Sequence, residues 1–346
     1  MLQQTQVATV VPYYLHWLER FPTLDLFARA PLDDVLKLWE GLGYYSRARN
    51  FHKAAQVVMA EHVGVIPQTV DALMRLPGIG RYTAGAIASL AFNQDAPLLD
   101  GNVKRVLSRV HGLRTASDDE LWQLAESALP KGRAGVFNEA LMELGATVCT
   151  PRTPRCVSCP INKHCQAFAS GDPEAFPAKR VRAATPHHDV LTAIVMNENG
   201  EVLMGQRPRD GLLGGLWEFV SSEFRGAGGE LVDVVRERTG LLIDESDAVM
   251  IGAVKHAFTH FKITRHVYLV HIPTNQKLKP SFPRRRESRP ASTLDSRLRG
   301  NDDPNGYDQL RWVPFDQVRA LALTRSDQKI LELYEKHCLS FFAQTR

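Results

Sequence analysis

Several features are scarce in this chain of 346 residues, and each scarcity excludes a class of protein. No apolar run reaches the roughly 18 residues of a membrane helix, and no basic stretch followed by an apolar block opens the chain. We therefore expect neither a membrane span nor a secretory signal. Five cysteines are too few for a disulfide scaffold. The net charge is only +4, from 42 basic and 38 acidic residues, so any nucleic-acid site must be a local patch.

The pattern of apolar residues in the sequence changes near residue 170. Up to that point apolar residues recur every three or four positions, which predicts helices separated by short turns. Residues 171–187 are rich in Pro, Ala and charge and predict a linker. Beyond them, short β-branched and aromatic segments alternate as strands do. We therefore predict an all-α domain over 1–170 and a smaller α+β domain over 188–346.

One segment of the second domain breaks its pattern. Residues 281–303 contain six Arg against four acidic residues and few residues that could form a core. Such a composition predicts a disordered, solvated insertion. The alternative is an accessory basic arm that touches DNA phosphates.

Four cysteines are crowded into 17 residues with the spacing Cys149-x6-Cys156-x2-Cys159-x5-Cys165. Four thiolates in one loop can hold a [4Fe–4S] cluster or a zinc ion. A zinc ribbon usually has two separated C-x2-C knuckles, and this loop has only one, so the spacing favours iron–sulfur. Four unrelated buried cysteines are the remaining alternative. The crowding indicates a metal centre in a reducing compartment.

A glycine-containing turn leads into an Ala-rich helical segment at Leu76-Pro77-Gly78-Ile79-Gly80. Gly78 and Gly80 would let the backbone approach a ligand closely. The N–H groups of the turn and of the helix start form an anion site that suits a DNA phosphate. The alternative is an ordinary turn between helices.

Asp100 follows two leucines and precedes the helical segment NVKRVLSRV. It could simply cap that helix. The functional alternative is a carboxylate at a helix start that faces a cleft and stabilises a cation formed on a sugar. Lys104 and Arg105 would add positive charge nearby.

The glycine-containing turn at 76–80, Asp100 and the four-cysteine loop follow one another in this order. In this they resemble the helix-hairpin-helix DNA glycosylases of the endonuclease III superfamily. Within it the chain is most similar to the MutY-type adenine DNA glycosylases. The resemblance covers nearly all of the chain except residues 281–303. It rests on the cysteine spacing and on the motifs MLQQTQV, GLGYYSRARN, LPGIGRYTAGAI, LDGNVKRVLSR, GLLGGLWEF and HAFTHFK.

The resemblance implies a fold, a cofactor and a reaction. The fold is an all-α helix-hairpin-helix glycosylase domain with a [4Fe–4S] loop, followed by a degenerate Nudix-like α+β domain. The cluster would be structural. The reaction is hydrolysis of the N-glycosidic bond of adenine opposite 8-oxoguanine or guanine in double-stranded DNA, after the adenine is flipped out of the stack.

The resemblance also assigns residues. Asp100 matches the carboxylate that stabilises the oxocarbenium-like sugar, and Tyr82 and Asn102 match residues that orient it. Endonuclease III-like lyases carry a lysine nucleophile where this chain has Tyr82, so no amine is in place for a Schiff base. A monofunctional glycosylase is therefore implied, and the glycosylase/lyase alternative is disfavoured.

Further positions match DNA contacts of the family. Gln4, Leu42 and Tyr44 match side chains that fill the gap or wedge beside 8-oxoguanine; their alternative roles are helix surface and core. The remaining DNA-binding candidates are Gly78, Gly80 and Lys104.

The C-terminal domain is implied to read the damaged base. Phe258, Thr259 and His260 match a short family loop that contacts 8-oxoguanine, with a simple strand pair as the alternative for the last two. A working Nudix hydrolase needs several glutamates before Gly240, and only Glu237 is in place. Metal-dependent pyrophosphate hydrolysis is therefore not expected.

The chain departs from the family at its start. The family's general acid is a glutamate two residues before the methionine of the MLQQT motif, and that methionine is Met1 here. Loss of a positioned acid costs roughly 10²–10⁴ in rate, and neither Glu40 nor Glu143 matches its position. The helical pattern begins at once, without a cap, so we expect the start to be assigned too late. The alternative is a catalytically dead remnant that only binds the mispair.

We expect a monomer that acts on the nucleoid in the bacterial cytoplasm. Its partner is DNA with adenine opposite 8-oxoguanine or guanine, and no membrane partner is expected.

Overall fold

The structure is a computed structural model that describes residues 1–3, 5–178, 184–222, 230–273, 276, 278 and 306–344. Gln4 and the insertion at 281–303 lie outside these described residues. The chain packs as two compact units, which we describe separately: Met1–His52 with Ala184–Arg346, and Lys53–Ala183. The domain limits given by the sequence stay a prediction. None of the described helices is long and apolar enough to cross a membrane.

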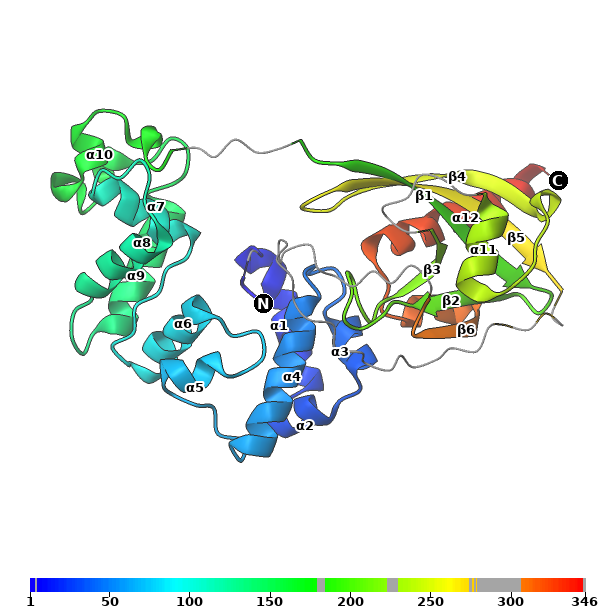
Figure 1. Ribbon diagram of the computed structural model, residues 1–346, viewed down its shortest axis with the longest axis horizontal. Coiled ribbons are helices and arrows are strands. Elements are labelled where there is room, and N and C mark those ends of the chain that lie inside the picture. Colours follow the sequence, from blue (N-terminus) through cyan, green and yellow to red (C-terminus); the bar gives the residue numbers. More distant parts are fainter. Residues whose placement is uncertain are drawn as a thin grey trace, which may run out of the picture. The chain divides into compact units, whose positions relative to one another are not determined.

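The unit Lys53–Ala183 is helical, as the periodicity predicts (Figure 1). After α4 (Ser46–Glu61), which starts in the other unit, come α5 (Val70–Met74), α6 (Arg81–Phe92), α7 (Gly101–Val110), α8 (Asp118–Ser127), α9 (Ala134–Thr147) and α10 (Gln166–Ala169). Short 3₁₀ turns occupy Cys156–Ser158, Asn162–His164 and Pro173–Ala175.

Local sequence explains where these helices begin and what they bury. Thr69, Asp100 and Ser117 each accept a hydrogen bond from the backbone N–H three residues later, so each caps the helix that follows it. The buried core between α6, α7 and α8 is aliphatic. Its fully buried members are Leu98, Leu99, Val103, Leu107, Leu121 and Ala125.

The other unit begins with α1 (Val7–Arg20), α2 (Leu24–Arg29), α3 (Leu32–Leu38) and the first half of α4. Their shared core is aromatic. Trp17 makes edge contacts with Phe21, Phe27 and Trp39 at centroid distances of 5.2, 4.9 and 5.8 Å. It also stacks on Phe51 at 5.7 Å. Such pairs stabilise a small helical group beyond the apolar area they bury.

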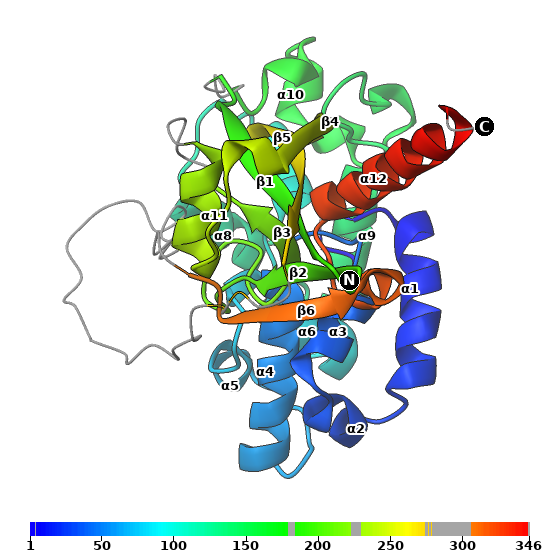
Figure 2. The same cartoon turned by 90° about the vertical axis from the view of Figure 1, so that its right-hand side faces the viewer.

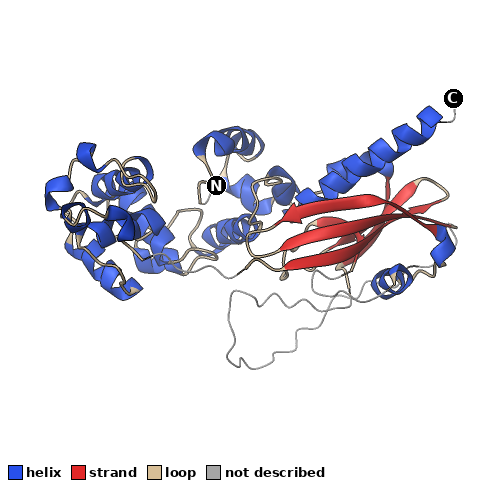
Figure 3. Ribbon diagram, turned by 90° about the horizontal axis from the view of Figure 1, so that it is seen from above, coloured by secondary structure: helices blue, strands red, loops and turns tan. Residues whose placement is uncertain are grey.

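The rest of this unit contains a mixed sheet of six strands in the order β4-β5-β1-β3-β2-β6 (Figure 3). The strands are β1 (His187–Asn197), β2 (Glu201–Gln206), β3 (Trp217–Ser221), β4 (Ala248–Ala257), β5 (Lys262–Ile272) and β6 (Gln309–Pro314). β1 and β5 run parallel, with His187 opposite Lys262, and the other pairs are antiparallel.

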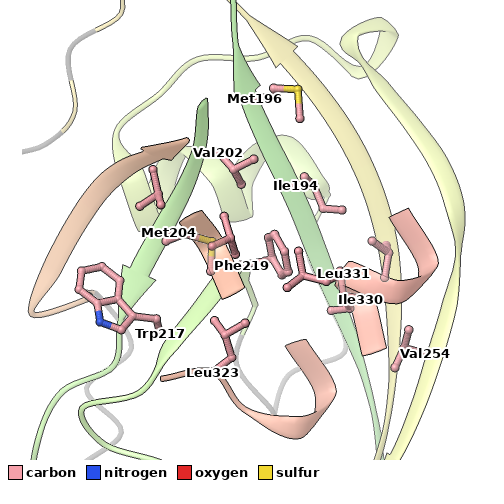
Figure 4. Close-up of a cluster of buried hydrophobic side chains, with 13 residues drawn as sticks. Ile194, Met196, Val202, Met204, Trp217, Phe219, Val254, Leu323, Ile330 and Leu331 are labelled. Carbon is pink, nitrogen blue, oxygen red and sulfur yellow. The ribbon is translucent and has the colours of Figure 1, made fainter. Parts of the chain in front are cut away.

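Helices cover both faces of the sheet, α11 (Leu231–Thr239) on one and α12 (Arg325–Gln344) on the other (Figure 2). This explains why residues 192–197 of β1 are buried without alternation. Figure 4 shows the core on the α12 side, where Met204 and Phe219 from the sheet meet Ile330 and Leu331.

A buried ion pair fixes α12 to the sheet. The guanidinium of Arg265 in β5 donates to Asp327 Oδ1 at 2.8 Å, and neither side chain is exposed. The same oxygen accepts the backbone N–H of Phe219 at 3.1 Å. Because both charges are satisfied by several partners, the pair sets how the helix docks.

The helices at the chain start are bonded to the sheet region of their own unit. Glu40 Oε1 accepts the backbone N–H of Leu323 at 2.8 Å, and Arg49 donates to the carbonyl of Gly214 at 2.8 Å. Lys37 donates to two carbonyls of the segment just before Leu323, at 2.8 and 3.0 Å. Glu40 therefore serves packing within this unit.

Candidate functional site

Asp100 is the N-cap residue of α7. Its Oδ1 atom accepts the backbone N–H of Val103 at 2.7 Å. Its Oδ2 atom receives the side-chain amide of Asn102 at 3.4 Å. The two alternatives for Asp100 are thus compatible, because the cap holds the half-buried carboxylate in one orientation and leaves Oδ2 for chemistry.

Tyr82 lies close to this carboxylate at the start of α6. Burial first, and then the negative charge of Asp100, raise the pKa of Tyr82 above its ordinary value. The Tyr82 hydroxyl contacts the sulfur of Met142 at 3.9 Å. Tyr82 is therefore a phenol within electrostatic range of the Asp100 carboxylate.

Arg105 connects this site to the cysteine loop. Its Nε atom donates to the carbonyl of Cys149 at 2.7 Å, and its Nη2 atom donates to the carbonyl of Gly145 at 2.6 Å and to Asn102 Oδ1 at 2.9 Å. Because Arg105 holds the Asn102 oxygen, the Asn102 amide nitrogen is turned toward Asp100. The sequence predicts that Arg105 adds positive charge near Asp100; its half-buried guanidinium also holds Asn102 and the start of the cysteine loop through these hydrogen bonds.

Close packing of α7 on α9 sustains this chain of hydrogen bonds. A Cβ atom added to Gly145 would lie 2.6 Å from Asn102 Cβ and 3.2 Å from its backbone atoms. Real Cβ atoms do not approach so closely. Glycine at 145 is therefore what lets α9 reach the first turn of α7.

The turn between α5 and α6 contains the two glycines of the predicted anion site. Gly78 has φ +77°, which favours glycine. Gly80 has an ordinary φ of −91°, and a Cβ added there would meet nothing within 4 Å. Gly80 is the N-cap residue of α6, a position at which glycine is favoured, and its Cα faces open space among the described residues.

The four cysteines form no disulfide and are all partly buried. Burial first, and then the neighbouring thiols of Cys149, Cys165 and Cys159, raise the pKa of Cys156. The four sulfurs therefore share one electrostatic environment. Within the described ranges, no group of three or more His, Cys, Asp or Glu side chains has metal-binding geometry. The donor chemistry fits an iron–sulfur cluster, because four free thiols are gathered in one loop.

Arg109 braces this loop from α7. Its side chain donates to Cys149 Sγ at 3.2 Å and to the carbonyls of Thr150 and Phe176 at 2.7 and 3.0 Å. It is 2% exposed, and its backbone carbonyl contacts Cys165 Sγ at 3.4 Å. A buried cation bonded to a sulfur ligand is the kind of partner that stabilises a thiolate set.

A second group of predicted residues meets in the other unit. The turn between β4 and β5 carries Phe258, Thr259 and His260, and the last two are exposed. The hydroxyl of Tyr44 lies 2.8 Å from Thr259 Oγ1, although the two residues are 215 positions apart. The structure thus brings together two residues that the sequence assigned separately to lesion reading.

The β4–β5 turn is held firmly at its base. Phe258 packs on Phe261 at 4.6 Å, and the Phe258 N–H donates to the Phe261 carbonyl at 2.8 Å. The N–H of Lys262 donates to the carbonyl of Pro186 at 2.8 Å, just before β1 begins. Contacts at its base therefore fix the turn, and Thr259 and His260 lie at its exposed end.

The sequence predicts three further DNA contacts, Leu42, Lys104 and Gln4. Leu42 is only 6% exposed, so its side chain belongs to the core in this structure. Lys104 forms an ion pair with Asp118 at 2.5 Å. Gln4 lies outside the described residues. The DNA-contact roles of all three stay predictions.

Sequence reasoning overlooked Arg109 and the hydrogen-bond partners of Arg105. Arg105 and Arg109 are four residues apart, so they lie on one face of α7. That face also carries Asn102, and the spacing could have shown that both cations point to the same neighbour. For Arg47, no comparable spacing in the sequence indicates which backbone carbonyls its guanidinium binds.

Comparison with known proteins agrees with this fold. Residues 1–131 match the HhH-GPD superfamily of base excision DNA repair proteins, and residues 191–333 match the NUDIX domain. The adenine DNA glycosylase of Rattus norvegicus is 35% identical, with the match covering 97% of this chain and 70% of the relative. That of Buchnera aphidicola subsp. Acyrthosiphon pisum is 34% identical, covering 79% and 77%. A solved thermostable thymine-DNA glycosylase is 29% identical over 49% of this chain and 80% of its own, with a TM-score of 0.46.

The helical part with its hairpin and the Nudix-like sheet define a base-excision DNA repair protein of the helix-hairpin-helix class. This confirms the predicted fold class. The matched relatives, which are 34–35% identical over most of this chain, identify the family within that class. The chain belongs to the adenine DNA glycosylase family, whose members hydrolyse N-glycosyl bonds.

Proposed function

We propose that this chain removes adenine paired with 8-oxoguanine or guanine from double-stranded DNA, and that it acts as a monofunctional glycosylase. The observation that carries the proposal is the fixed carboxylate of Asp100, held between Val103 N–H and the Asn102 amide. A carboxylate so oriented is suited to stabilise positive charge on C1′ of a flipped nucleotide.

The reaction needs a proton and a water molecule besides this carboxylate. A general acid protonates the adenine, the C1′–N9 bond breaks, and the base leaves as neutral adenine. Asp100 stabilises the oxocarbenium-like sugar that remains. Water then adds to C1′ and loses a proton, which gives an abasic site.

Tyr82 supports the monofunctional assignment. Its pKa is raised by burial and by Asp100, so the phenol stays neutral beside the carboxylate. A neutral phenol cannot form a Schiff base with the abasic sugar, whereas a lysine amine could. Strand cleavage is therefore not part of the proposed reaction.

DNA binding and lesion reading involve both units. Gly80, with open space at its Cβ position and the start of α6 directly behind it, suits a phosphate. In the other unit, the exposed Thr259 and His260 and the nearby Tyr44 supply hydroxyl and imidazole groups that can pair with the altered edge of 8-oxoguanine.

We propose that Cys149, Cys156, Cys159 and Cys165 hold a [4Fe–4S] cluster. Bound there, it would brace the loop and would supply no chemistry to the glycosidic bond. The free thiols, their shared environment and the N–H of Arg109 at Cys149 Sγ support this set of ligands. About four iron atoms per chain are expected, and Cys156→Ser should lower that number and the visible absorbance. Zinc without iron in the purified protein would contradict the assignment.

The test of the function is single-turnover excision on a duplex with adenine opposite 8-oxoguanine. It should be run on this chain and on a form to which an N-terminal segment with a general-acid glutamate has been added. Excision that depends on Asp100, with no adduct trapped by borohydride, supports the proposal. Tight mispair binding without excision by either form would favour a binding protein instead. A trapped adduct would favour a lyase.

The same proposal includes the setting in which the chain works. As a family member with bacterial relatives, it would act as a monomer on the chromosome in the bacterial cytoplasm. Analytical ultracentrifugation of the purified chain tests the monomer.

A further inference from the structure

The loop that carries Tyr44 has an unfavourable backbone. Gly41, Gly43 and Tyr44 have φ values of +98°, +69° and +47°. Glycine tolerates this left-handed region, but a tyrosine rarely adopts it. Something outside the loop must therefore hold it in place, because the conformation of Tyr44 is not one its own backbone prefers.

The side chain of Arg47 fixes the conformation of this loop. Its Nη2 atom donates to the carbonyls of Leu42 and Gly43 at 3.2 and 3.3 Å. Its guanidinium also lies over the ring of Tyr44, at 5.5 Å, and over Trp39, at 5.3 Å. Two carbonyls and two rings thus enclose one planar cation, which fixes both the loop backbone and the Tyr44 ring.

The same guanidinium reaches the first residues of the chain. Its Nη1 atom donates to the carbonyl of Met1 at 3.1 Å and also to the carbonyl of Gln3. Its Nη2 atom lies 3.4 Å from Thr5 Oγ1. Residues 41–44 contain positions matched to lesion contacts, so one side chain joins this loop to Met1, Gln3 and Thr5 at the start of the chain.

Tyr44 extends the connection to the third segment. Its hydroxyl lies 2.8 Å from Thr259 Oγ1, at the exposed end of the β4–β5 turn. The order of contacts is therefore Arg47 to Tyr44 to Thr259, within one compact unit.

We infer that Arg47 is a positioning residue for lesion discrimination. It assembles the lesion-reading surface, made of residues 1–3, 5, 41–44 and 258–260, before DNA binds, and does so without touching the lesion. This inference rests on the proposed function of that surface. It concerns recognition only and assigns Arg47 no part in breaking the glycosidic bond.

The geometry requires arginine in particular. The guanidinium is a flat fork whose two terminal nitrogens here bond to different segments while its faces meet aromatic rings. A lysine ammonium has the charge but is a single point with three donors. Arg47→Lys should therefore keep the fold and the charge and lose the assembled surface.

The test compares Arg47→Lys and Arg47→Ala with the matched control Arg29→Ala. Arg29 pairs with Asp25 on the exposed surface and serves none of the three segments. The first measurement is hydrogen exchange of the amides in residues 39–47, without DNA. The second is the ratio of dissociation constants for full-length protein on duplexes with adenine opposite 8-oxoguanine and opposite guanine.

In Arg47→Lys we expect exchange over residues 41–45 to accelerate and the preference for 8-oxoguanine to fall about tenfold. The control should match the wild-type chain in both measurements. Unchanged exchange, or faster exchange with the preference intact, would overturn the inference. If Arg47→Ala unfolds, the lysine variant still decides. If the wild-type chain shows no preference for 8-oxoguanine, the proposed function fails, while the exchange result still shows whether Arg47 holds the loop.

Discussion

Replacing Gly145 with alanine tests whether the contact between α9 and α7 positions Asn102 against Asp100, the proposed catalytic carboxylate. The added methyl group would lie 2.6 Å from Asn102 Cβ. Since carbon atoms pack at about 3.5–4.0 Å, the first turn of α7 must move by about 1 Å. The Asn102 to Asp100 contact is already 3.4 Å long, so a shift of the Asn102 side chain relative to Asp100 breaks it.

Two effects of known size follow from that movement. Overpacking of a tight contact costs about 1–3 kcal/mol of folding free energy. A misplacement of about 1 Å at a reacting group can cost roughly 10²-fold in rate. We therefore expect Gly145→Ala to lower the melting temperature moderately and to slow single-turnover excision far more than the loss of stability explains.

The control is Gly306→Ala, because a Cβ added at 306 would meet nothing within 4 Å. It should leave both the melting temperature and the excision rate unchanged. A Gly145→Ala protein with the wild-type rate would refute the claim that this contact sets the position of Asn102. The assay is meaningful in the form of the chain that excises adenine, and the melting temperature can be measured in either form.

Three further predictions concern single side chains. Asp100→Asn should lower the excision rate by roughly 10²–10³-fold. It should barely change the melting temperature, because asparagine caps a helix as well as aspartate does. A large fall in melting temperature would contradict the view that the structural role of Asp100 is only that of a helix cap. Asp327→Ala leaves the buried charge of Arg265 without its partner and should lower the free energy of unfolding in urea by about 3–5 kcal/mol. The control Glu335→Ala removes an exposed ion pair and should lower it by less than about 1 kcal/mol. Burial raises the pKa of Tyr45 to about 12. Because the folded pKa lies above the unfolded one, this burial contributes about 3 kcal/mol of stability below pH 10, and the contribution is lost as pH rises toward 12. Urea midpoints of Tyr45→Phe should lack that part of the alkaline decline, and an identical decline in both proteins would count against it.

Local signals in the sequence predicted much of the fold. The 3.6-residue periodicity gave the helices, and β-branched runs gave β1 and β5. Caps such as Ser117 and the left-handed Gly240 at the end of α11 are local features, readable within a few residues. The change of texture near residue 170 separated the helical from the α+β part for the same reason.

The site was predictable only where one residue carries the chemistry. Asp100 and Tyr82 stand out by their place in motifs, and the structure puts them close together. The sequence shows that Arg105 is a cation but not which carbonyls it faces. Glu40 accepts a backbone N–H from a residue 283 positions away. Such long-range partners leave no periodic or spacing signal.

The parallel pairing of β1 with β5 has a practical consequence for dissecting the protein. It puts Pro186, where the chain enters the sheet, against Lys262, at the foot of the turn that bears Thr259. A shortened version starting at His187 would delete the acceptor for the Lys262 N–H, and a fusion joined there would crowd the very segment under investigation. Fragments meant to report on that turn should keep several residues ahead of Pro186.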